Sequence, residues 1–119
     1  MIADIYDAMG RITRLVSLSG NMRGSKGSWQ AQTARGQGAQ NHMEIFHLER
    51  LGKVLERLMA RQDFKISKLD IGILGKKTNS VVSENKMCEG CQAVKKTEID
   101  DRIAGKKIAL DFNVCFLKE

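Results

Sequence analysis

Residues 41–62 have the sequence NHMEIFHLERLGKVLERLMARQ, which predicts an amphipathic helix. Leu48, Leu51, Leu55 and Leu58 recur at steps of three and four residues and therefore lie on one stripe of a helix. Asn41 and Glu44 have the spacing of a capping box, which marks the start of the helix. The stripe either covers a sheet of the same chain, the usual source of helix stability, or forms part of a seam with a second chain.

Residues 2–19 show a similar pattern, because Ile2, Ile5, Met9, Ile12 and Val16 recur at steps of three and four residues. They predict an N-terminal helix that ends near Gly20. Two helices with matching apolar stripes favour packing within or between chains, so we expect a homo-oligomer. The predicted interface consists of Ile5, Met9, Ile12, Val16, Leu48, Leu51, Leu55 and Leu58.

Residues 20–41 lie between the two predicted helices and are rich in Gly, Ser, Gln and Ala. They contain Arg23, Lys26 and Arg35, and no acidic residue occurs between Ala8 and Met43. One interpretation is a flexible connector. The other is a basic arm that becomes ordered on a polyanion, with Trp29 as a stacking side chain.

The remainder of the chain predicts strands. Residues 107–116 alternate strictly, so that Ile108, Leu110, Phe112, Val114 and Phe116 share one face. Residues 64–73 also alternate, with a slip of phase typical of a bulge, and residues 80–83 and 93–98 predict shorter strands. Short connections favour an antiparallel meander of three to five strands. The whole chain, residues 1–119, is therefore predicted to be one α+β domain.

Cys88 and Cys91 have the spacing of a zinc-binding pair, but they supply only half of a tetrahedral site. Cys115 is the candidate third ligand, although the alternation of its strand directs it away from the long helix. His42 and His47 are five residues apart and do not share a helix face, so we expect no metal pair, and His47 is predicted to be partly exposed. We therefore expect no cofactor and interpret the cysteines as idle or loosely paired thiols, with a zinc site at Cys88, Cys91 and Cys115 as the alternative.

The net charge of +6 permits a polyanionic partner. If the pairs Lys76-Lys77 and Lys106-Lys107 met at one edge of the sheet, they would form a ridge for phosphate groups, whereas lysines on an edge also discourage aggregation. The candidate residues for nucleic acid or another polyanion are Arg11, Arg14, Arg23, Lys26, Trp29, Arg35, Lys76, Lys77, Lys106 and Lys107.

No catalytic constellation is visible, and the acidic group of Glu98, Asp100 and Asp101 is typical of a solvated surface, so a non-enzymatic protein is expected. The leading hypothesis is a small basic assembly or adaptor protein that self-associates through its helices and binds a macromolecular partner. The alternatives are a nucleic-acid-binding protein and a zinc-stabilised binding module. The absence of a long apolar run and of a secretory signal predicts no membrane partner and a cytoplasmic or other intracellular location.

Overall fold

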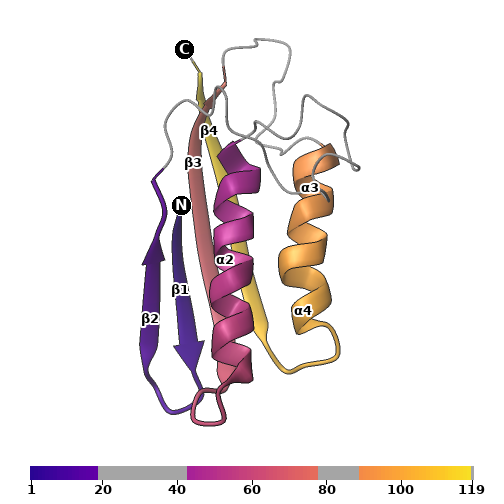
Figure 1. The fold of residues 1–119 in the computed structure, drawn as a ribbon. Coiled ribbons are helices and arrows are strands. Elements are labelled where there is room, and N and C mark those ends of the chain that lie inside the picture. Colours follow the sequence, from indigo (N-terminus) through magenta and orange to yellow (C-terminus); the bar gives the residue numbers. More distant parts are fainter. Residues whose placement is uncertain (19–42, 78–88, 119) are drawn as a thin grey trace.

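A computed structural model describes residues 1–18, 43–77 and 89–118 of the chain. In chain order the elements are β1 (Ile2–Asp7), β2 (Ile12–Val16), α2 (Met43–Ala60), β3 (Ile66–Lys77), α3 (Glu89–Lys95), the π-helical turn η2 (Lys96–Asp100), α4 (Asp101–Ile103) and β4 (Ala109–Lys118). The strands form one sheet in the order β2-β1-β3-β4, and the helices lie against one of its faces (Figure 1). The mixed α and β composition expected from the sequence is thus confirmed.

The predicted helix over residues 2–19 is wrong, because β1 and β2 form an antiparallel hairpin there. Gly10 allows the tight turn between them, since its φ of +90° is one that residues with a Cβ rarely adopt. Ala3, Ile5 and Asp7 are buried at a period of two, as in a strand with one covered face. The apparent helical spacing is not the period of one element, because its apolar residues come from two separate strands, β1 and β2. Three of them, Ile2, Ile12 and Val16, are exposed.

The predicted antiparallel meander is also wrong, because β3 and β4 are parallel and residues 93–98 are helical. α3, η2 and α4 form the crossover that a parallel pair requires. Val94 and Ile99 are both buried although they are five residues apart, and η2 begins between them, at Lys96. The wider π-helical turn keeps both side chains on one face, which a search for helical spacing misses. The predicted strand at residues 80–83 lies outside the described residues.

Three other predictions are confirmed. The long helix appears as α2, and the alternating residues 107–116 appear as β4. The slip of phase in residues 64–73 corresponds to an irregularity in the pairing of β1 with β3, where Tyr6 pairs with Lys68 but Asp7 pairs with Ile66. Ser67 is therefore the extra residue of a bulge.

α2 and α3 cover the same face of the sheet because of the order and direction of the strands. β2 and β3 are each antiparallel to β1 and hence parallel to one another, as β3 and β4 are. The connections from β2 to β3 and from β3 to β4 step in the same direction across the sheet. Right-handed crossovers in one direction place their helices on one face, where α2 and α3 lie (Figure 1).

The core lies between α2 and the sheet. The leucines of the α2 stripe are buried within this one chain, together with apolar side chains from β1 and β3. The stripe therefore covers a sheet of its own chain, the first of the two interpretations above. The fully buried side chains of this layer include Ile5, Ile45, Leu48, Leu51, Leu55, Leu69 and Ile71.

Candidate protein interface

The sheet face opposite the helices, here called the open face, is organised in rows by the strand register. One row reads Arg14, Asp4, Asp70 and Asp111 from β2 to β4, and it is called the acidic row. Because side chains alternate, the rows two residues away on each strand lie on the same face. In the part of the chain that the structure describes, no helix covers this face.

The apolar end of the open face consists of Ile2, Val16, Leu18 and Leu74, which are 49%, 49%, 83% and 60% exposed. These side chains, with Asn113 and Cys115, border a shallow hollow of about 660 Å³. Gly72 lies in the row of Ile2 and leaves open space where a side chain would otherwise stand. Large exposed apolar side chains that gather around one hollow are typical of an interaction surface.

The acidic row carries one strong internal pair. Arg14 donates from Nε and Nη2 to the two carboxylate oxygens of Asp4, over 2.7 Å and 2.9 Å. This bidentate hydrogen bond lowers the pKa of Asp4 below its ordinary value. Asp4 is therefore neutralised within the chain, whereas no carboxylate partner in the described part of the chain neutralises Lys68 in the next row. Lys68 instead lies 5.5 Å from the ring centre of Tyr6.

His47 lies behind the apolar end, on the covered side of the sheet. It was predicted to be partly exposed, but it is only 2% exposed, and its Nδ1 is 2.7 Å from the Oγ of Ser17. Burial, the nearby amino terminus and Arg50 lower the pKa of His47 to about 4. Ser17 is fully buried, so this Ser–His pair fastens α2 to the end of β2 and does not present a nucleophile.

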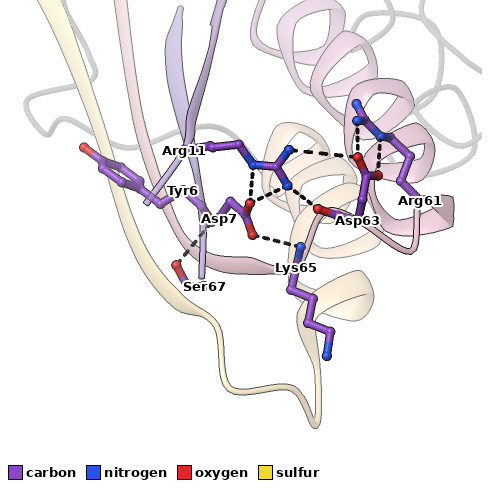
Figure 2. Close-up of polar contacts among 7 residues, drawn as sticks. All are labelled: Tyr6, Asp7, Arg11, Arg61, Asp63, Lys65 and Ser67. Atoms are coloured by element: carbon purple, nitrogen blue, oxygen red, sulfur yellow. Dashed lines mark hydrogen bonds and ion pairs between the residues drawn. The ribbon is translucent and has the colours of Figure 1, made fainter. Parts of the chain in front are cut away.

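A second polar cluster closes the opposite end of the sheet (Figure 2). Asp7 is buried and accepts a hydrogen bond from Arg11 Nε over 2.6 Å and one from the backbone N–H of Lys65 over 3.1 Å. Arg11 also donates to the carbonyl of Asp63, whose carboxylate pairs with Arg61. This cluster joins the β1–β2 turn to the segment that connects α2 with β3. The residues of this cluster are not regularly spaced in the sequence, so no sequence pattern predicts it.

The predicted polyanion-binding residues do not form one surface. Arg11 and Arg14 are each paired with an aspartate. Because β3 and β4 are parallel, Lys106-Lys107 precede β4 at one end of the sheet and Lys76-Lys77 end β3 at the other. Lys107 comes before Ala109, the partner of Lys68, and Lys76 follows Lys68 by eight residues, so the two pairs are more than about 26 Å apart at roughly 3.3 Å per residue. The predicted ridge is therefore wrong. Arg23, Lys26, Trp29 and Arg35 lie outside the described residues.

The described cysteines do not share a site. Cys91 is buried under α2, with its Sγ 3.7 Å from Glu44 Oε2, whereas Cys115 is exposed on the open face. The prediction that Cys115 points away from the long helix is confirmed. Cys88 lies outside the described residues. Within the described ranges no three His, Cys, Asp or Glu side chains are grouped to hold a metal ion.

Of the predicted interface residues, Ile5, Leu48, Leu51 and Leu55 are fully buried and Leu58 is 7% exposed, which leaves them little surface for a second chain. Met9, Ile12 and Val16 are exposed. The interface candidates that the sequence did not indicate are Ile2, Leu18 and Leu74. Ile2 and Leu74 are exposed because of the face that each takes in its strand, and Leu18 lies just beyond the end of β2.

Comparisons with family models, with curated proteins and with solved structures find no match to this chain. None of the helices in the described ranges has the length and apolar character needed to cross a membrane.

Proposed function

We propose that this chain is a small, non-enzymatic assembly protein that self-associates through the open face of its sheet. The observation that carries the proposal is the apolar end of that face, where four large side chains are exposed around a hollow. Burial of apolar surface contributes about 25 cal/mol per Å², so covering this end favours association. Of the two helices assigned to this task from the sequence, the first is a strand hairpin and the second, α2, has its apolar stripe in the core.

A second copy is the occupant that the pattern of the face favours. In a two-fold dimer the same patch faces itself, and an axis parallel to the strands reverses the order of the strands in each row. Ile2 then faces the space above Gly72 of the second copy, since these residues share a row. In the acidic row Arg14 faces Asp111 of the second copy. A large side chain thus opposes a gap, and Arg14, which already bonds Asp4 in its own chain, faces a further anion.

A third row adds two more matched pairs. It reads Ile12, Tyr6, Lys68 and Ala109, so reversal places a large residue over a small one and an aromatic ring near an ammonium group. Asp4 would face Asp70 of the second copy, but Asp4 is already neutralised by Arg14. Two sheets packed face to face with nearly aligned strands are a common arrangement in proteins.

A cysteine cross-link tests this arrangement. Leu18 and Cys115 extend the outer strands at the apolar end, and three strand spacings within one chain separate them by about 14 Å, too far for a disulfide. Across the proposed dimer axis the same two positions face one another. In a Cys88→Ser background, Leu18→Cys should therefore give a covalent dimer on mild oxidation, and Cys115→Ser should abolish it.

Met9→Cys is the matched control, because Met9 and Leu18 are equally exposed at 83% and Met9 lies at the β1–β2 turn. Sedimentation equilibrium of the unmodified chain should give a dimer mass that Leu18→Ser shifts toward the monomer and Met9→Ser does not. A monomer at high micromolar concentration, or equal cross-linking from both positions, would contradict the proposal.

Nucleic-acid binding is the alternative, favoured by the absence of acidic residues between Ala8 and Met43. The acidic row makes the open face a poor surface for phosphates, so this alternative depends on residues 20–41. Its signature is an affinity that falls steeply as salt is raised from 50 to 200 mM. A salt-insensitive or absent interaction with single- and double-stranded probes would exclude it.

A further inference from the structure

A second hollow lies at the end of the sheet where β3 and β4 begin. It encloses about 410 Å³ between the last turn of α2 and these two strand starts. Three lysines line it, Lys65 from the β3 side and the Lys106-Lys107 pair from the β4 side. The parallel pairing of β3 with β4 brings them together, since both strands start at this end of the sheet.

The charged residues that line this hollow are all basic. No acidic residue is among those that line it, and no carboxylate in the described part of the chain forms an ion pair with the three lysines. Two acids close to Lys65, Asp7 in the fold and Asp63 in the sequence, pair with Arg11 and Arg61. Asp7 uses only the backbone N–H of Lys65, and the Lys65 side chain extends away from that cluster (Figure 2). Three ammonium groups are thus left for an anion.

The floor of the hollow is apolar and includes Met59, Phe64 and Ile108. Lys106 extends over Met59, with its Nζ 4.0 Å from the sulfur. A volume of this size is within the range of small-molecule sites, which combine apolar walls with a few polar groups. We propose that this hollow binds a small organic phosphate, with the phosphate among the lysines and the organic group against the floor. A dianion fits three cations better than a single carboxylate does, and lysine binds phosphate as a point charge.

Titration calorimetry with phenyl phosphate tests the site, with inorganic phosphate and phenol as the partial ligands. Phenyl phosphate should bind more tightly than either, and its affinity should fall as salt is raised. The double variant Lys106→Met, Lys107→Met should weaken it at least tenfold, and Lys65→Met should also weaken it. Lys53→Met is the matched control, because Lys53 is exposed on α2 away from the hollow.

Circular dichroism would establish that the variants are folded, which their exposed positions favour. Equal affinity of the double variant and the control would overturn the proposal, as would the absence of binding at millimolar phenyl phosphate. Equal affinity for phenyl phosphate and inorganic phosphate would remove the role of the apolar floor. The hollow and the open face are separate, so this outcome does not depend on self-association.

Discussion

The imidazole of His47 and the hydroxyl of Ser17 lie 2.7 Å apart in a fully enclosed position, and this contact joins the first turns of α2 to the end of β2. The amino group of Met1 donates to the carbonyl of Ser17 over 2.8 Å, and Arg50 approaches the same hydroxyl at 3.4 Å. A neutral imidazole fits this cationic environment, and a protonated one does not.

Acid should therefore destabilise the fold through His47. Its pKa is about 4 in the folded chain and about 6.5 when unfolded, so the unfolded state binds the proton first. Stability is fully present above pH 6.5 and decreases as the pH falls to 4, by about 3 kcal/mol. Urea unfolding at several pH values measures this slope. The free energy of unfolding of His47→Gln should depend less on pH between 6.5 and 4. Parallel pH curves for the wild type and the variant would refute the role of His47.

Asp7→Asn should lower the melting temperature by several degrees at neutral pH. Burial alone would raise the pKa of Asp7, but hydrogen bonds from Arg11 and from the backbone N–H groups of Lys65 and Met9 lower it below its ordinary value. The carboxylate contributes stability above that ordinary value near 3.8, and the contribution is lost as the pH falls below it. The difference between wild type and variant should thus shrink in acid. The exposed Asp63→Asn serves as the control and should have a smaller effect.

Leu51→Ala should cost about 2–5 kcal/mol of unfolding free energy, because Leu51 is fully buried and the cavity cannot close completely. The exposed Lys53→Ala should change stability by less than about 0.5 kcal/mol. Urea unfolding gives both values. A loss of oligomerisation with unchanged monomer stability would return the α2 stripe to the role of an intermolecular seam.

Gly52→Ala should be close to neutral, although alanine favours a helix by about 1 kcal/mol. A methyl group at this position would overlap the carboxylate of Glu98, which is bonded to Arg102 over 2.5 Å. In a Glu98→Ala background the nearest obstacle is absent and the neighbouring Nη1 of Arg102 loses its carboxylate partner, so the same substitution should stabilise by up to about 1 kcal/mol. A double-mutant cycle measures this coupling, and additivity would show that Glu98 is not the obstacle.

Local patterns were reliable where one period dominated a long stretch. The α2 stripe and the β4 alternation each repeat over several turns or residue pairs, and both elements were predicted with nearly correct bounds. A neighbour also approaches closely beside the stripe, at Gly52, where the Glu98 carboxylate occupies the space of a side chain. Competing periods caused the errors, because spacings of three and four in residues 2–19 also fit two short strands joined at Gly10.

The candidate surfaces depend on pairing that a linear pattern does not contain. The acidic row exists only because Asp4, Asp70 and Asp111 fall into register across three strands. The Lys106-Lys107 pair was singled out, but its partner in space is Lys65, because β4 runs parallel to β3. This proximity could be predicted only from a helical crossover between β3 and β4. The five-residue spacing of Val94 and Ile99 does not match the period of an α-helix, so the sequence did not indicate that crossover.

The central position of β1 in the sheet has a consequence for how the chain folds. β1 can close its hairpin with β2 at once, a step that takes microseconds, since their pairing spans few residues. Its other edge pairs with β3, more than 60 residues later for Ala3 and Ile71, and β4 adds only after the last crossover. During synthesis one edge of β1 therefore has no strand to pair with until β3 emerges. We expect these distant strand pairings, rather than the helices, to set the rate of folding.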